Sequence, residues 1–289
     1  MTVYYLVRVL SAFLCLLPRR IAYAMVTVGA DITYLAWPRG RNAIRDNMSH
    51  VLGVGASPGE IDRLARQSLR NYCCYIVDFL RLARLGQADL ERRTFSPGCH
   101  HIDRALQEGK GAILVGLHMG NWDLGGAVIS SRNYPLNVVV ESFAPARLNE
   151  FVQRPRIEKG MKVIPMERGV KRMVQTLRCN ELLALLIDRP CPGEGVAVRF
   201  CNAVTHVPRG AATLALKTGA TVLPAASVRL PNNTFLTMID SHISFQPSGD
   251  IKSDIQELTQ KIMSALERMV QQYPDQWYMF RPMWQTESA

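Results

Sequence analysis

The residues best suited to chemistry lie in the segment 118–123, which reads His-Met-Gly-Asn-Trp-Asp. It directly follows the apolar run 112–117, so a β-strand would deliver His118 to the loop at its carboxyl end. An imidazole held by a carboxylate can take a proton from a hydroxyl group, because the carboxylate fixes the tautomer and stabilises the imidazolium. Asp123 lies five residues downstream, and Gly120 leaves room beside the ring. The spacing therefore predicts a general-base pair of His118 and Asp123; the alternative is a buried structural histidine with an unrelated aspartate.

A second apolar run also ends in ionisable residues. Asp188 and Arg189 directly follow the run 182–187, which has the composition of a buried strand. Ligands in open α/β sheets gather at the carboxyl ends of the strands, where His118 is also expected. We therefore predict that Asp188 and Arg189 lie at the same edge of the sheet as His118. The alternative for Asp188 is a simple hydrogen-bond acceptor at the end of a strand.

Strand-like apolar runs alternate along the chain with amphipathic helical patterns. The runs predicted as strands are 112–117, 137–141, 162–165, 182–187, 196–200, 221–226 and 235–245. The predicted helices are 57–84, one from about 123, and then 147–159, 169–178, 208–217 and 253–273. Ser57 and Ser253 are the expected N-caps of the first and the last helix, because Glu60 and Gln256 follow at capping-box spacing. This alternation predicts an α/β fold with a mostly parallel central sheet flanked by helices.

The N-terminal residues differ in composition from the rest of the chain. Residues 1–45 hold six arginines and one acidic residue, interleaved with the apolar runs 3–17 and 21–37. Each run is shorter than the ~20 residues that a membrane-spanning helix needs. Arginines and aromatic residues at the ends of apolar helices are typical of helices that lie in a membrane interface. We therefore predict an interfacial helical hairpin at 1–45 and a catalytic domain at 46–289, the alternative being a soluble helix pair capped by arginines.

The composition also argues against several classes of function. The formal net charge of +10 favours acidic partners such as nucleic acid, anionic lipid or phosphorylated substrates. The basic residues flank apolar helices rather than exposed aromatic platforms, which disfavours nucleic-acid binding. Seven scattered cysteines without a Cys-x-x-Cys pair argue against a disulfide framework and a zinc site. An anionic membrane surface and a phosphorylated substrate are the acidic partners that remain.

Taken together, these segments resemble the lysophospholipid acyltransferase superfamily. The closest branch is that of the bacterial lipid A biosynthesis acyltransferases and the phosphatidylinositol mannoside acyltransferases. The matching segments are His118 to Asp123, the basic helix 147–160 with 163–165, Asp188-Arg189 followed by 195–200, Pro208-x-Gly210 through Pro224, and the aromatic segment 277–284. The likeness covers nearly the whole chain.

The resemblance implies a glycerol-3-phosphate acyltransferase-like fold and acyl transfer from acyl-CoA or an acyl carrier protein to a hydroxyl of a lipid or glycolipid. It implies no further cofactor and no metal. His118 would be the general base and Asp123 would orient it. Backbone N–H groups near Gly120–Asn121 and the side chain of Arg189 are candidate donors to the oxyanion. The candidate substrate-binding residues are Asn121, Arg154, Arg156, Asp188, Arg189 and Arg209.

Some alternatives stay open on the sequence. Arg154 and Arg156 could hold phosphates or form a solvated helix face, and Arg209 could close a surface turn. Relatives usually carry a glutamate shortly after the strand at 196–200; here Ala203 stands at that position, and Glu194 comes earlier. A lipid ester or thioester hydrolase would use the same histidine pair on water. The expected location is the cytoplasmic face of the cell (inner) membrane, with peripheral or monotopic attachment.

Overall fold

The computed structural model describes residues 2–191, 193 and 195–284 of the chain. Its core is a seven-stranded sheet in the order β1-β9-β8-β2-β5-β3-β4. In the described part of the chain, the pairing of β8 with β9 is the one antiparallel pairing of this sheet, so β9 and its parallel neighbour β1 run opposite to the other five strands. The strands are β1 (Thr94–Phe95), β2 (Ala112–Gly116), β3 (Leu136–Val140), β4 (Lys162–Pro165), β5 (Leu182–Leu186), β6 (Val196–Phe200), β7 (Ala203–Val207), β8 (Thr221–Arg229) and β9 (Phe235–Ile239). The predicted mostly parallel α/β fold is confirmed.

Helices cover both faces of this sheet. Their bounds are α1 (Thr2–Leu16), α2 (Arg19–Ala36), α3 (Pro38–Leu52), α4 (Pro58–Arg81), α5 (Gln87–Arg93), α6 (Cys99–Gln107), α7 (Trp122–Ser131), α8 (Ala146–Glu158), α9 (Val170–Arg178), α10 (Gly210–Thr218) and α11 (Ile251–Gln272). Side chains of β2 alternate between the two layers. Ile113 and Val115 pack with α9, α10 and α11, whereas Ala112 and Leu114 pack with α5, α6 and α7. Because β2 is covered on both faces, its sequence is apolar without alternation.

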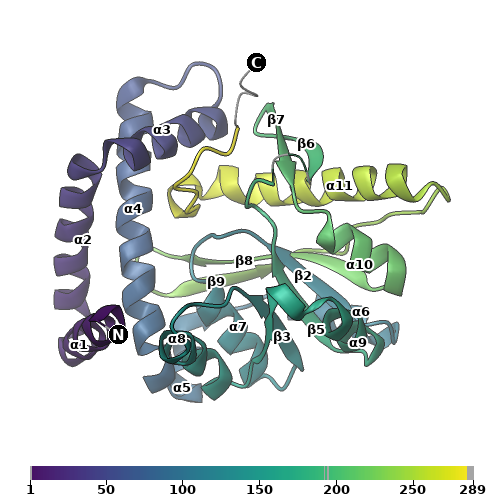
Figure 1. The fold of residues 1–289 in the computed structure, drawn as a ribbon, viewed down its shortest axis with the longest axis horizontal. Coiled ribbons are helices and arrows are strands. Elements are labelled where there is room, and N and C mark those ends of the chain that lie inside the picture. The colour runs from purple at the N-terminus through teal and green to yellow at the C-terminus, as the bar shows by residue number, and fades with distance from the viewer. Residues whose placement is uncertain (1, 192, 194, 285–289) are drawn as a thin grey trace.

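The N-terminal helices lie along one side of the molecule, where α2 packs on the long helix α4 (Figure 1). Ion pairs join Asp31 of α2 to Arg66 and Arg70 of α4, at 2.8 and 2.6 Å. The outward faces carry exposed apolar side chains: Tyr5, Leu6, Val9, Leu10, Phe13 and Leu16 on α1, and Ile21, Met25, Val28, Ile32 and Leu35 on α2. Within the described residues, no helix combines the length and the apolar character needed to cross a bilayer.

Several elements differ from the sequence-based expectation. Helix α3 was not expected, and residue 45 lies inside it. Strand β7 was also not expected; it pairs with β6 as a separate antiparallel hairpin, and Ala203 pairs with Phe200. The predicted N-cap of the last helix was wrong, because the side chain of Asp250 accepts the capping bond and α11 begins two residues earlier than expected. Ser57 does cap α4, accepting a hydrogen bond from the backbone N–H of Glu60 at 3.2 Å.

Candidate active site

The central pair of the site is His118 and Asp188. Strands β2 and β5 are parallel neighbours with Gly116 opposite Leu186, so the residues two positions beyond each strand lie side by side. His118 Nδ1 is 2.7 Å from Asp188 Oδ1, and the backbone N–H of His118 donates to Oδ2 at 2.9 Å. The Asp188 side chain is fully buried, whereas 22% of the His118 side chain is exposed. With an ionised Asp188, Nδ1 carries the proton, and Nε2 is left as the free basic atom.

The charge state of Asp188 follows from its surroundings. Burial by itself raises the pKa of this carboxyl group, because a charge in the interior loses hydration. The imidazole and backbone N–H of His118 and the indole of Trp277 outweigh burial and hold the pKa below its ordinary value. The carboxylate is therefore ionised at neutral pH and can fix the tautomer of the neighbouring ring.

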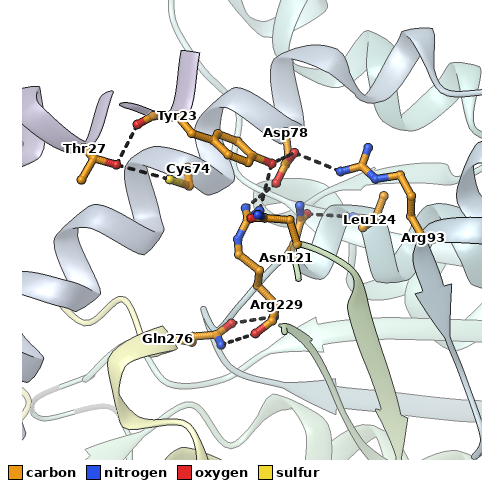
Figure 2. Close-up of polar contacts among 10 residues, drawn as sticks. Tyr23, Thr27, Cys74, Asp78, Arg93, Asn121, Leu124, Arg229 and Gln276 are labelled. Carbon is orange, nitrogen blue, oxygen red and sulfur yellow. Dashed lines mark hydrogen bonds and ion pairs between the residues drawn. The ribbon is translucent and has the colours of Figure 1, made fainter. Parts of the chain in front are cut away.

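The C-terminal segment closes around the loop that carries His118. The backbone N–H of Tyr278 donates to the carbonyl of His118 at 2.8 Å, and that of Gly120 donates to the carbonyl of Gln276 at 2.8 Å. The side chain of Gln276 forms two hydrogen bonds with the backbone of Arg229 on β8 (Figure 2). The loop is thus fixed between β8 and the C-terminal segment.

Asp123 occupies a different environment from the one predicted. Its Oδ1 accepts a hydrogen bond from Arg156 Nε at 2.6 Å, and its Oδ2 accepts one from the hydroxyl of Tyr75 at 2.8 Å. Asp123 and Tyr75 are buried and Arg156 is mostly buried, and Asp123 forms no hydrogen bond or ion pair with His118. The predicted contact between His118 and Asp123 is therefore wrong. The reason is local: Asn121 starts α7 by accepting from the N–H of Leu124, and the first helical turn carries Asp123 toward α4 and α8.

Comparison with known proteins identifies the kind of enzyme. Residues 1–286 match the family described as bacterial lipid A biosynthesis acyltransferase. The chain belongs to this acyltransferase family. Over 269 residues it is 28% identical to a phosphatidylinositol mannoside acyltransferase of Mycolicibacterium smegmatis, covering 91% of this chain and 86% of that protein. It is 30% identical over 261 residues to a protein of the same description from Mycobacterium tuberculosis, covering 87% and 79%. The resemblance inferred from the sequence is confirmed, and the protein is a lipid acyltransferase.

The arginines predicted to bind substrate are distributed unevenly in this acyltransferase. Arg156 is mostly buried and paired with Asp123, so it is not available to hold a phosphate. Arg154 is 73% exposed and pairs with Glu158 on the surface of α8 at 2.6 Å, and Arg209 is exposed directly before α10. Of the predicted arginines, only Arg189 adjoins the central pair, directly after Asp188.

The expected donors to an oxyanion also need correction. The backbone N–H of Gly120 is bonded to Gln276, and that of Asn121 donates to the carbonyl of Ser227 at 2.6 Å. Neither N–H can therefore bind an oxyanion, and Asn121 is almost fully buried as the cap of α7. Arg189, which forms an ion pair with Glu141, remains as a candidate donor. Burial and then the positive charge of Arg281 lower the pKa of Arg189.

A buried ionic cluster lies beside the site of the acyltransferase and had no signal in the sequence spacing. Asp78 of α4 contacts Arg229 of β8 and Arg93 of α5, and it accepts a hydrogen bond from the hydroxyl of Tyr23 at 2.5 Å (Figure 2). Burial and the carboxylate of Asp78 raise the pKa of Tyr23 to about 12, so the phenol stays protonated as a donor. The same Arg229 holds Gln276 through its backbone. This cluster connects α2 to the loop that carries His118 through Arg229 and Gln276.

Proposed function

We propose that this acyltransferase moves a fatty acyl chain from acyl-CoA or an acyl carrier protein to a hydroxyl group of a glycolipid, with His118 as the general base. The observation that carries the proposal is the buried carboxylate of Asp188 on Nδ1 of a partly exposed imidazole. Nε2 takes the proton of the acceptor hydroxyl as its oxygen attacks the thioester carbonyl. The imidazolium then returns that proton to the departing thiolate. A positioned base of this kind contributes about 10²–10⁴-fold to a rate.

We infer that Arg189 stabilises the negative charge of the reaction. The tetrahedral intermediate carries an oxyanion, and a fixed cation in a partly buried position stabilises it more strongly than solvent does. Arg189 adjoins Asp188, and Arg281 acts on it electrostatically. The guanidinium groups of Arg189 and Arg281 also suit phosphates of the donor or of an acceptor head group.

The proposed acceptor class rests on the relatives. Two of them are described as phosphatidylinositol mannoside acyltransferases. A sugar hydroxyl on a membrane lipid meets the requirement of the site for an alcohol whose proton can pass to Nε2. The hydrolase alternative would place water in the same position, and it differs in one measurable respect: its rate does not depend on an acceptor.

The experiment is acyl transfer from labelled palmitoyl-CoA by the purified full-length chain, with and without a total lipid extract from the source cell. We expect a labelled glycolipid by mass spectrometry and release of free thiol that rises with the acceptor. Thiol release that is indifferent to added lipid, with free fatty acid as the labelled product, would support hydrolysis instead.

We propose further that the hairpin of α1 and α2 binds the cytoplasmic membrane surface. The exposed apolar side chains of α2 recur every three or four residues, so they form one stripe facing away from α4. Arg8, Arg19 and Arg20 accompany the stripe and suit anionic lipid head groups.

The test of this attachment is sedimentation with vesicles containing anionic lipid. Val28→Lys and Ile32→Lys together should release the protein, whereas Ile251→Lys, an equally exposed apolar position at the start of α11, should not. Unchanged sedimentation of the α2 variant would refute this attachment.

A further inference from the structure

We propose that Trp277 is a positioning residue of the acyl-transfer reaction, acting through its indole N–H on the carboxylate of Asp188. This inference rests on the proposed role of His118 as the base. Trp277 Nε1 donates to Asp188 Oδ2 at 2.9 Å. The contact joins the C-terminal segment to the carboxyl end of β5, 89 positions apart in the sequence.

The two oxygens of Asp188 have different tasks. Oδ2 accepts from two donors, the backbone N–H of His118 and the indole of Trp277, and Oδ1 faces the imidazole. A carboxylate can rotate about its terminal torsion, which has broad preferences. Two donors on one oxygen fix that rotation, so Oδ1 stays aligned with Nδ1. The indole of Trp277 therefore orients the carboxylate of Asp188, and this carboxylate in turn orients the imidazole of His118.

The indole itself has little freedom to move. Its side chain is completely buried and packs edge-on against Phe200, with ring centroids 5.6 Å apart. The carbonyl of Trp277 accepts a hydrogen bond from the buried hydroxyl of Ser68 at 2.7 Å. Its backbone also forms an isolated antiparallel bridge with Met119. The donor is thus fixed on three sides before any substrate binds, which suits a positioning role.

The chain offers a matched control in Trp284. Its ring lies 6.3 Å from that of Trp277 and also contacts Phe200, so both belong to one aromatic cluster. Among the residues that the structure describes, the indole nitrogen of Trp284 is buried without a hydrogen-bond partner. Trp→Phe at either position removes a similar volume, but only the change at 277 removes a hydrogen bond. The difference between the variants therefore isolates the N–H.

The experiment compares Trp277→Phe and Trp284→Phe in acyl transfer from palmitoyl-CoA to the lipid acceptor. We expect kcat to fall about tenfold or more for Trp277→Phe, with KM for the donor unchanged, because a hydrogen bond to a charged group is lost outside the substrate site. Trp284→Phe should keep the parent kcat. Equal losses in both variants, or a Trp277→Phe kcat within about twofold of the parent, would overturn the proposal.

A second readout does not depend on activity. ¹⁵N-histidine NMR of the full chain, with the His118 signal assigned by its loss in His118→Gln, reports the tautomer of the ring. The parent and Trp284→Phe should show a single Nδ1-protonated ring, and Trp277→Phe a mixture of tautomers. An unchanged tautomer in Trp277→Phe would overturn the positioning role, whereas transfer surviving in His118→Gln would remove the proposed base without affecting this result. If Trp277→Phe fails to fold, benzothienylalanine at position 277 keeps the bicyclic shape without the N–H and serves the same comparison.

Discussion

Asp123→Asn separates a structural role for this residue from a catalytic one. In the structure the carboxylate neutralises Arg156 in the interior, and exposed fractions of the two side chains are only 3% and 12%. The amide keeps the shape and one acceptor oxygen, but it leaves the guanidinium buried without a counter-charge. The hydroxyl of Tyr75 also loses its charged acceptor. We expect the variant to lose stability while the contact between His118 and Asp188 stays intact.

The size of the effect follows from the burial of the pair. Removing one partner of a buried ion pair costs about 3–5 kcal/mol, a large share of the roughly 5–15 kcal/mol that stabilises a folded protein. Each kcal/mol corresponds to about 2–4 °C in Tm for a large domain, so the expected loss is roughly 6–20 °C. Arg154→Gln serves as the control, because Arg154 pairs with Glu158 on an exposed face and its loss should leave Tm within error.

The assay is thermal unfolding by circular dichroism, together with the transfer rate at a temperature where all variants are folded. The double variant Asp123→Asn with Arg156→Gln removes both charges and should recover part of the lost Tm. Folded Asp123→Asn should retain most of its transfer activity. A variant with unchanged Tm and a rate reduced by 10² or more would show instead that Asp123 acts on the base, and it would refute the reasoning.

Two further predictions concern the loop that carries His118 and the ion pairs between α2 and α4. Gly120 has φ +61°, and a Cβ there would lie 2.0 Å from the carbonyl oxygen of Ser227. Gly120→Ala should therefore displace the loop that carries His118 and lower the transfer rate strongly. The control is Gly59→Ala, which should leave the transfer rate unchanged because a Cβ at Gly59 would meet nothing within 4 Å. Asp31 has its pKa held well below the ordinary value by Arg70 and then Arg66, against the effect of burial. This contribution to stability is complete above the unfolded pKa of about 4 and is lost as pH falls through the lowered folded pKa. The Tm difference between the parent and Asp31→Asn should therefore be constant from about pH 5 to 8 and close below about pH 4; a difference that grows with acidification would contradict the assignment.

The sequence was most informative where burial imposes a pattern. The apolar runs at 112–117 and 182–187 are the central strands β2 and β5, and their parallel register brings His118 and Asp188 together as the carboxyl-edge rule predicted. The short spacing between His118 and Asp123 led to a wrong prediction of contact, because helix α7 begins between these two residues. Nothing in the spacing could show that the turn of α7 directs Asp123 toward Arg156, 33 positions away.

Other features escaped prediction for related reasons. Strand β7 has little apolar alternation and follows β6 through Cys201 and Asn202, both with positive φ, which lack the usual Asn-Gly hairpin signature. The role of Trp277 depends on a contact across 89 positions, which no local pattern encodes. Glu194, which precedes the position of the family glutamate, lies outside the described residues.

The central claim is that one imidazole removes the acceptor proton, and His118→Ala tests it most directly. The measurement is the single-turnover rate of acyl transfer from labelled palmitoyl-CoA, with circular dichroism and vesicle sedimentation as checks on fold and binding. The account predicts a rate lower by at least about 10²–10⁴-fold with both checks unchanged. Transfer at a near-parental rate by the folded, membrane-bound variant would contradict it.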